Sequence, residues 1–289
     1  MRLCRFNANR LGVVEDDAIL DVTAALDVLP EVRWPLPSRG DLLIQHLDAV
    51  RSRVAELVEQ AERHEVSDVK ILSPVANPSK LIAAPVNYRL HVDEANADKG
   101  ISFDQPKLKS ISELLCFLKA VSALVGPGEG VTRRFPDRRT DHEIELAVII
   151  GHETNQIEYS RALECVAGYA IGLDMTVRGK EERSLRKSID SYAVLGPWLV
   201  TKDEIEDPDN LHLTLRVNGE VRQDAGTDEL IYDVKTLISK ISEFYTLYPG
   251  DVLYTGTPAG VGPVMPGDVM DCEIEGIGRM EVAVVDASS

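Results

Sequence analysis

Two apolar segments near the middle of the chain are predicted to be buried β-strands. Residues 146–150 (LAVII) form a continuous apolar run that stops at Gly151, and residues 166–173 (VAGYAIGL) form a second run that is followed by Asp174. A short apolar run without polar interruptions is typical of a strand that is buried on both of its faces. The pattern therefore predicts the centre of a sheet between residues 143 and 174.

The first 72 residues are predicted to form a small α+β domain of their own. Short β-type segments at residues 2–6, 11–14 and 18–22 precede a Pro-rich patch. Apolar residues then recur at helical spacing from Leu43 to Ala61, with charged residues between them. This pattern predicts an amphipathic helix.

The main domain is expected to span residues 80–289. Residues 73–80 (SPVANPSK) have the composition of a linker or turn. Farther along, Asn218-Gly219 within VNGEV is the strongest hairpin signal in the chain. Two Pro-Gly-Asp turns, at residues 249–251 and 266–268, each open a β-type segment.

Composition and charge exclude several classes of partner. The chain has 289 residues, of which 44% are hydrophobic and 27% are charged, as in ordinary globular proteins. The net charge of −17 argues against nucleic acid or an anionic membrane as a partner, although a local cation cluster or metal can still hold a small anionic substrate. The four cysteines form no Cys-x-x-Cys pair, which indicates reduced thiols, and the N-terminus has no apolar signal segment. We therefore expect a cytoplasmic protein that does not span a membrane.

Glu143 and Glu145 stand at the head of the first apolar run. Residues two apart on a strand project to the same face, so these carboxylates lie side by side and repel each other unless a cation neutralises them. Together with Asp174 they form an all-oxygen set that suits Mg²⁺ or Mn²⁺, with Ca²⁺ as a further option. The alternative is a Glu-x-Glu on the solvent face of an edge strand. The continuous apolar run after Glu145 favours the metal site, because carboxylates at the end of a buried strand need a partner.

His91 and Glu94 are a candidate general base and its carboxylate partner. If a helix begins near His91, the three-residue spacing places the two side chains next to each other. A carboxylate beside an imidazole fixes the tautomer of the ring and raises its basicity. The same spacing also fits a helix start at which Glu94 forms a capping box. The spacing alone leaves both interpretations open.

Three other histidines are not assigned to the site. His46 and His64 are interpreted as surface residues within or just after the amphipathic helix. His142 precedes Glu143 on the expected strand, so it should point the opposite way.

Two segments have the character of loops that could border a site. Residues 97–113 are polar, Lys-rich and interrupted by Gly and Pro, which fits either a mobile lid or a plain surface loop. Residues 255–262 (TGTPAGVG) are rich in Gly and small residues, which allows backbone to approach a ligand closely.

Several cationic residues lie near these segments in the sequence. Lys119 ends a short apolar strand, and Arg178 and Lys187 follow the second apolar run at a short distance. Arg183 and Arg186 lie between them and are interpreted as part of a solvated charge run.

A series of ordered segments resembles the motifs of the fumarylacetoacetate hydrolase family. The resemblance covers residues 80–285, some two thirds of the chain. The segments are NYRLH…E, FLKAVSALVGPGEGV, DHEIELAVIIG, VAGYAIGLDMTVRG, RKSIDSYAVLGPWLVT, VNGEVRQ, LYPGDVLYTGTPAGVG and PGDVMDCEIEGIG. The resemblance implies an α+β, mainly β fold, with a mixed β-sandwich roll after the small N-terminal α+β domain. It also implies a Mg²⁺ or Mn²⁺ site and a homodimer.

The resemblance, together with the residue patterns, defines a candidate site. Its members are the metal ligands Glu143, Glu145 and Asp174, the catalytic residues His91, Glu94 and Lys187, and the substrate contacts Lys119, Arg178, Glu181 and Thr257. The family's usual pattern is not fully kept, because Gly179 and Glu181 replace an Asp and a Gln, and Leu90 replaces the Asp before the histidine. These replacements affect the expected substrate contacts, whereas the expected metal ligands are all present.

The predicted activity is metal-dependent hydrolysis of a C–C bond in an acylpyruvate-like or β-diketo acid. A chelated 2-oxo acid would develop enolate charge against the metal while His91 activates a water. The alternatives are an isomerase, hydratase or decarboxylase that acts on a related 2-oxo dicarboxylic acid, or a metal-binding protein without catalysis. The presence of both His91 and Lys187 favours an enzyme.

Overall fold

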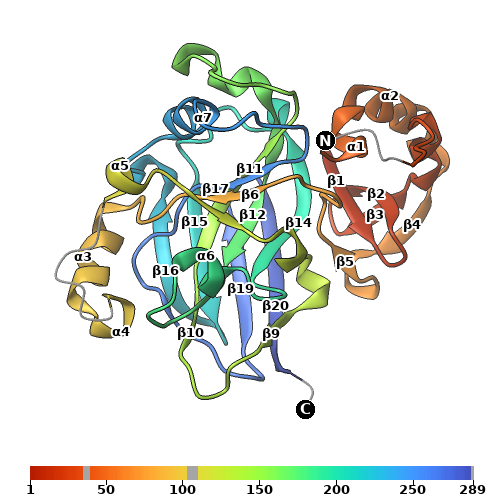
Figure 1. The fold of residues 1–289 in the computed structure, drawn as a ribbon. Helices are drawn as coiled ribbons and strands as arrows, with labels where there is room; N and C mark the ends of the chain where they lie inside the picture. The colour runs from red at the N-terminus through yellow and green to blue at the C-terminus, as the bar shows by residue number, and fades with distance from the viewer. Residues whose placement is uncertain (35–39, 103–109, 288–289) are drawn as a thin grey trace.

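One mixed sheet runs through most of the molecule (Figure 1). The computed structural model describes residues 1–34, 40–102 and 110–287. The sheet has 12 strands in the order β4-β3-β2-β1-β14-β12-β11-β17-β6-β7, with β5 paired to β1 and β8 paired to β14. The bounds are β1 Arg2–Phe6, β2 Arg10–Glu15, β3 Ala18–Asp21, β4 Glu62–Glu65, β5 Ile71–Leu72, β6 Leu81–Ala83, β7 Phe117–Lys119, β8 Leu124–Val125, β11 Ile144–Ile150, β12 Val166–Asp174, β14 Ala193–Thr201 and β17 Val252–Tyr254.

A second sheet packs against the middle of the first. It has five strands in the order β16-β15-β19-β20-β9, and a small three-stranded sheet, β13-β10-β18, lies beside the site. The bounds are β9 Val131–Arg133, β10 Thr140–His142, β13 Thr176–Val177, β15 His212–Val217, β16 Glu220–Gly226, β18 Gly262–Pro263, β19 Val269–Ile274 and β20 Gly278–Asp286. Ile144 and Val148 of β11 share one hydrophobic core with Leu213 of β15 and Val282 of β20.

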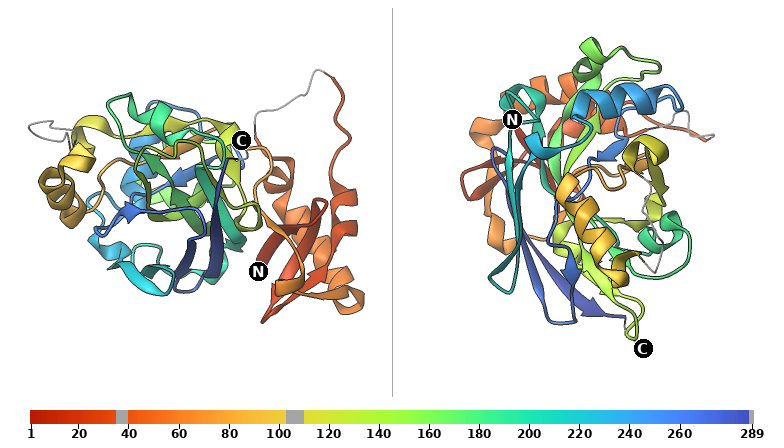
Figure 2. Two further views of the ribbon diagram at one scale, coloured as in Figure 1. Left: turned by 90° about the horizontal axis from the view of Figure 1, so that it is seen from below. Right: turned by 90° about the vertical axis from the view of Figure 1, so that its left-hand side faces the viewer.

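Helices are short and lie around the sheets (Figures 1 and 2). They are α1 Leu42–Gln45, α2 Leu47–Leu57, α3 Arg89–Ala97, α4 Lys99–Ser102, α5 Ile111–Leu114, α6 Arg183–Lys187 and α7 Val234–Ser242. Single 3₁₀ turns are η1 Thr23–Val28, η2 Val58–Gln60, η3 Val66–Asp68, η4 Val121–Ala123, η5 Pro127–Glu129, η6 Tyr159–Cys165, η7 Lys202–Glu204 and η8 Thr227–Glu229. The molecule is therefore α+β and mainly β, as predicted.

The central strands are buried on both faces. Every residue of β11 and of β12 is buried, and the two strands pair antiparallel with Ile144 opposite Leu173. Ala147 and Ile149 of β11 belong to a second core, on the opposite side of the strand from Ile144 and Val148. The continuous apolar pattern of these segments is explained by this position between two cores.

The predicted helix between Leu43 and Ala61 is interrupted. Helix α1 ends at Gln45. The next residue, His46, leaves the helical region (φ −111°, ψ 25°), and α2 begins at Leu47. The Asp41 side chain caps α1 by accepting hydrogen bonds from the backbone N–H groups of Leu43 and Ile44. The predicted hairpin is present, with Asn218 and Gly219 both at positive φ (51° and 83°) between β15 and β16.

The N-terminal unit lies to one side of the remainder in Figure 2 but shares its sheet. Strand β1 pairs with β14, with Arg2 opposite Val200 and Leu3 opposite Leu199. Leu3 also belongs to the same hydrophobic core as Ala147 of β11. The division into residues 1–72 and 80–289 stays a prediction.

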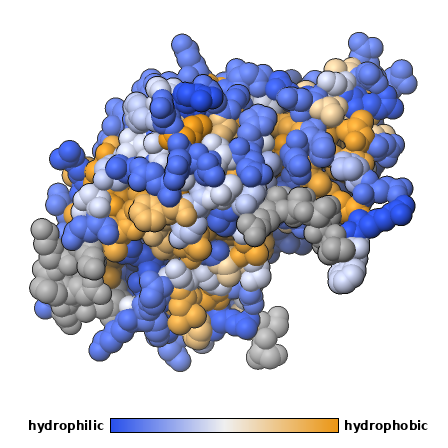
Figure 3. Space-filling model, turned by 45° about the horizontal axis from the view of Figure 1, so that its top comes forward, coloured by the Kyte–Doolittle hydropathy of each residue, from blue (hydrophilic) through white to orange (hydrophobic). Residues whose placement is uncertain are grey.

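No helix in the described part of the chain is long and apolar enough to cross a bilayer. The face drawn in Figure 3 is mostly hydrophilic, with smaller apolar areas between the charged side chains.

Candidate active site

Three carboxylates meet where β11 begins and β12 ends. Glu145 is the second residue of β11, Glu143 directly precedes that strand, and Asp174 is the last residue of β12. The backbone N–H of Asp174 donates to the carbonyl of Glu143 (2.9 Å), which fixes the two chain segments to each other. One carboxylate oxygen from each residue lies within 4.8 Å of the other two, and all three residues are buried.

Glu143 and Glu145 have opposite electrostatic environments. Burial raises the pKa of the Glu145 carboxyl well above its usual value, and the neighbouring Asp174 raises it further. Burial acts in the same direction on Glu143, but the cations of Lys187 and Arg178 outweigh it and hold the pKa of Glu143 well below its usual value. The positive charge of Lys187 and Arg178 therefore outweighs burial at Glu143, whereas at Glu145 the effect of Lys187 does not.

The donor set fits a hard divalent cation. Glu145 Oε2 accepts the backbone N–H of Gly256 (2.6 Å), whereas no described residue hydrogen-bonds to Glu145 Oε1. The cluster offers oxygen atoms alone, without Cys or His, which is the chemistry that Mg²⁺ and Mn²⁺ prefer. The carboxylates predicted as metal ligands could therefore hold such an ion.

Two lysines surround Asp174. Lys187, the last residue of α6, donates from Nζ to Glu143 Oε2 and to Asp174 Oδ2, each at 2.6 Å. Lys119, at the end of β7, bonds Asp174 Oδ1 and the carbonyl of Tyr192, and its side chain is fully buried. Lys187 lines the cavity, but Lys119 lies behind Asp174 and is not part of the lining. A substrate contact by Lys119 stays a prediction.

Arg178 is held by two carboxylates. Its Nε donates to Asp141 Oδ2 (2.8 Å) and its Nη2 donates to Glu143 Oε1 (3.0 Å). Asp141 also accepts from Arg139 Nε (2.7 Å) and is completely buried. Sequence reasoning missed Asp141, although its position two residues before Glu143 was a signal, because residues at i and i+2 on extended chain share a face.

His91 and Glu94 form the predicted pair in α3. His91 Nδ1 lies 2.9 Å from Glu94 Oε2 and is the donor, since a carboxylate can only accept. Glu94 Oε1 accepts the backbone N–H of Gly260 (2.9 Å), so the carboxylate does not form the capping box that was the alternative. His91 lines the cavity, and no described residue hydrogen-bonds to its Nε2. This nitrogen is available to accept a proton.

Gln223 of β16 organises the loop after β17. Its Nε2 donates to Thr257 Oγ1 (2.7 Å) and to the carbonyl of Pro258 (2.9 Å), while its Oε1 accepts from the backbone N–H of Ile144 (3.1 Å). Thr257 lines the cavity and donates its hydroxyl to the carbonyl of Ile144 (2.8 Å). Nothing in the sequence pattern around Gln223 signalled this role. His142 Nδ1 also contacts Gln223 Oε1 (3.1 Å), and His142 is not part of the cavity lining.

The cavity joins these groups in one space of about 730 Å³, part of which is open to solvent. Its walls include the carboxylates, His91, Lys187, Arg178 and Thr257, and the apolar residues Ala84, Val86, Ala95, Ile101 and Phe117. Arg183 and Arg186 also line it, so their interpretation as solvated charges is wrong. Helix α6 turns both side chains inward, which the sequence spacing did not reveal.

Glu181 borders the same cavity but is already paired. Both of its carboxylate oxygens accept from Arg138, at 3.0 and 2.8 Å. Arg138 also donates to the carbonyl of Arg178 (2.8 Å), so it ties two loops together. A substrate contact by Glu181 stays a prediction. The possible lid at residues 97–113 falls partly on residues 103–109, which lie outside the described residues.

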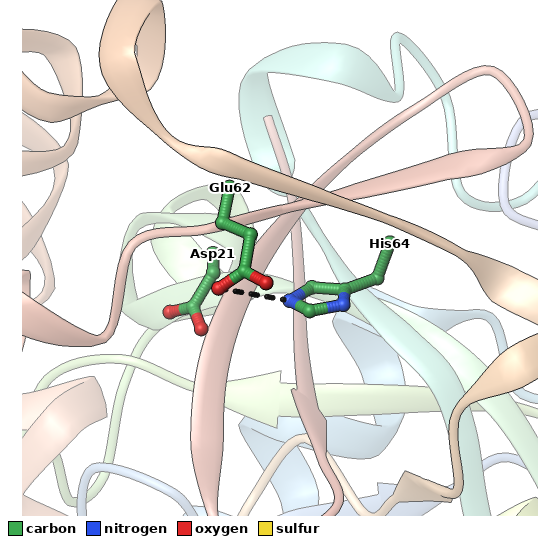
Figure 4. Close-up of side chains that lie close together, drawn as sticks. All are labelled: Asp21, Glu62 and His64. Atoms are coloured by element: carbon green, nitrogen blue, oxygen red, sulfur yellow. Dashed lines mark ion pairs between the residues drawn. The ribbon is translucent and has the colours of Figure 1, made fainter.

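A second group of potential ligands lies in the N-terminal unit (Figure 4). Asp21 of β3 faces Glu62 and His64 of β4, and His64 Nε2 lies 3.7 Å from Glu62 Oε2. His64 is thus a half-buried strand residue, not the surface residue that was expected near the helix. The guanidinium of Arg10 contacts Asp21 Oδ2 and lies 3.3 Å from Glu62 Oε2. Because this arginine already neutralises the carboxylates, we assign no metal to them.

Comparison with known proteins gives the family. The model of the fumarylacetoacetate (FAA) hydrolase C-terminal domain matches residues 80–285. The chain belongs to the fumarylacetoacetate hydrolase family. Within this family it is 56% identical to maleylpyruvate hydrolase of Aquipseudomonas alcaligenes, over 98% of this chain and 99% of that protein. It is 39% identical to the mitochondrial oxaloacetate tautomerase FAHD2A of Homo sapiens, over 96% of this chain and 90% of that protein.

A solved structure of a family member has the same fold. The maleylpyruvate hydrolase of Sphingobium sp. SYK-6, in complex with manganese(II) ion and pyruvate, superimposes with a TM-score of 0.83. It is 36% identical and covers 100% of both chains. The predicted family and fold class are confirmed, and the predicted metal and substrate classes agree with what that complex contains.

Proposed function

We propose that this protein is a divalent-metal-dependent hydrolase that cleaves a C–C bond of an acylpyruvate, with maleylpyruvate or a close analogue as its substrate. The observation on which this rests is the His91–Glu94 pair in the same cavity as the three buried carboxylates. The near-full-length similarity to maleylpyruvate hydrolase supports the substrate class.

Glu143, Glu145 and Asp174 would hold a Mg²⁺ or Mn²⁺ ion. Such an ion, when bound, supplies positive charge to the oxygens of a 2-oxo acid as enolate charge develops. Arg178 keeps Glu143 ionised and oriented through the 3.0 Å contact of Nη2. Lys119 holds the Asp174 carboxylate in place through its contact with Oδ1, from outside the cavity lining.

His91 would act as the general base. Its Nδ1 proton is committed to Glu94, so Nε2 is free to take a proton from a water that attacks the acyl carbonyl carbon. The bond between that carbon and the neighbouring methylene then breaks, and its electron pair goes to the pyruvate fragment as an enolate. Return of a proton to the methylene carbon yields pyruvate and a carboxylic acid.

Lys187 is placed to bind anionic oxygens. Two of the three ammonium protons are donated to Glu143 and Asp174, which leaves the third for a substrate oxygen in the cavity. The ring of Phe117, with its centroid 5.5 Å from Lys187 Nζ, forms an apolar part of the lining next to the ammonium group.

The direct test is turnover of maleylpyruvate, fumarylpyruvate, acetylpyruvate and oxaloacetate with Mg²⁺ or Mn²⁺ and then with EDTA. We expect EDTA-sensitive loss of diketone absorbance and release of two acids. Release of CO₂, or interconversion of the keto and enol forms of oxaloacetate without cleavage, would instead establish the decarboxylase or tautomerase alternative. The tautomerase is the second candidate because the human relative bears that name.

Two further features belong to the same proposal. The resemblance supports a homodimer, and a cytoplasmic location is in keeping with four free cysteines. Light scattering of the purified protein tests the first, since a single species at the mass of one chain, 31.8 kDa, would refute it.

A further inference from the structure

We propose that Arg183 binds the carboxylate at the acyl end of the substrate and so makes the enzyme selective for dicarboxylic acylpyruvates. This inference rests on the proposed function, because it concerns the far end of the same substrate.

Arg183 and Lys187 are the first and last residues of α6. Residues four apart on a helix lie on one face, about 5–6 Å from each other. Both side chains lie against the ring of Phe117, with Arg183 Cζ 5.6 Å and Lys187 Nζ 5.5 Å from its centroid. Lys187 reaches the carboxylate cluster, so Arg183 is one helical turn farther along the same cavity wall.

The arginines around Arg183 are already bound. Arg178 donates to Asp141 and Glu143, and Arg186 donates to the carbonyls of Glu181 (2.8 Å) and Val177 (3.4 Å).

Arg183 differs from them in having free donors. Among the residues that the structure describes, none accepts a hydrogen bond from its guanidinium or forms an ion pair with it. Burial lowers the pKa of Arg183, but arginine stays charged at neutral pH because its ordinary pKa is so high. Glu143, Asp174 and Glu182 attract this cation electrostatically, but no described acceptor replaces the hydrogen bonds to water that burial removes.

A substrate carboxylate is the ligand that this group fits. The planar guanidinium presents paired N–H donors that match the two oxygens of a carboxylate. The distance of one helical turn from the carboxylate cluster suits an acid whose second carboxylate lies a few carbons beyond the pyruvate part. Ala95, Ile101 and Val86 on the lining provide apolar contact for those carbons.

The test compares two substrates in two variants. Arg183→Gln should lower kcat/KM for a dicarboxylic substrate, maleylpyruvate or fumarylpyruvate, by about 10- to 100-fold, because a charge-assisted pair is lost. It should leave kcat/KM for acetylpyruvate, which lacks the second carboxylate, within about threefold. Arg134→Gln is the matched control: it removes the same charge from an exposed arginine that is not part of the cavity lining, and it should spare both substrates.

The alternative outcomes are distinct. Equal losses on both kinds of substrate would overturn the inference, since Arg183 would then act at the pyruvate end or on the fold. No loss on either would overturn it too. If the unaltered enzyme cleaves neither substrate, the proposed function fails, and calorimetric titration with maleate decides about Arg183 separately. Binding weakened about tenfold in Arg183→Gln but not in Arg134→Gln supports the carboxylate site, and unchanged binding refutes it.

Discussion

At the scale of single residues, His91 has a role that can be separated from metal binding. Replacing it by Ala removes the base, while the three carboxylates keep their own contacts to Lys187, Arg178 and Gly256. We expect turnover to fall by about 100-fold or more. Mn²⁺ affinity, measured by titration calorimetry, should change little. If the variant loses the metal and its fold together, His91 is a structural residue and not the base.

Asp209 is a residue whose ionisation is expected to oppose folding. Burial raises its pKa from 3.8 to about 6, and Asp233 and Asp207 add to the effect, although the backbone N–H of Val234 lowers it. The native state therefore holds a proton that the unfolded chain releases near pH 4, and this contribution to stability is lost as the pH rises from about 4 to about 6.

Asp209→Asn keeps the acceptor for Val234 and removes the charge. We expect it to stabilise the protein at pH 8 by about 1 kcal/mol, after allowance for the partial exposure of the side chain, and by much less at pH 4. Urea denaturation at both pH values measures this. A larger gain at pH 4 than at pH 8 would contradict the assigned environment.

The parts of the site that follow from local strand or helix periodicity could be predicted from the sequence. Contacts between residues far apart in the chain could not. The placement of Glu143, Glu145 and Asp174 follows from strand periodicity, and the contact of His91 with Glu94 follows from helix periodicity. The inward direction of Arg183 does not, because α6 is a single short turn and the ring against which Arg183 lies belongs to Phe117, a residue far away in the chain.

At the scale of elements, the loop after β17 requires glycine at one position. Gly256 has φ 104°, and a Cβ there would lie 2.6 Å from the Cβ of Asn87. Gly256→Ala should therefore destabilise the protein by about 2 kcal/mol or more and displace the N–H that Glu145 accepts. Gly267→Ala is the control, because Gly267 has a similar φ of 93° but no atom within 4 Å of an added Cβ.

The control should cost only the backbone strain, about 1–2 kcal/mol. Chemical denaturation gives both values, and Mn²⁺ titration shows whether the site is disturbed. If the two variants are destabilised equally, the structure accommodates the added Cβ next to Asn87 without a further loss of folding free energy, and the prediction is wrong.

The elements themselves were predictable where one local pattern dominated. The apolar run of β11 and the Asn218-Gly219 turn were of this kind. The break between α1 and α2 at His46 was not, because the buried residues Leu43, Leu47, Val50 and Val54 keep helical spacing across it. The pairing of β1 with β14 could not be predicted either, since the paired residues are nearly two hundred positions apart in the chain.

At the scale of the whole molecule, metal binding should be coupled to stability. A ligand that binds only the native state stabilises it, by about 2.7 kcal/mol at a concentration of 100 Kd. We expect Mn²⁺ to raise the melting temperature and EDTA to reverse the effect. In Glu145→Gln, which removes one of the three carboxylates, the increase should be much smaller. An unaltered increase in that variant would place the ion elsewhere.

Because β1 pairs with β14, the N-terminal unit and the main domain share one sheet, and this affects the behaviour of residues 80–285 when they are produced alone. Without β1, the outer side of β14 around Leu199 and Val200 would present unpaired backbone groups, and the core that Leu3 shares with Ala147 would lose one wall. An open, apolar strand edge recruits strands from other molecules. The shortened protein would thus be prone to aggregate, although it would keep all the residues of the candidate site. By covering this strand edge, the N-terminal residues protect the protein from self-association.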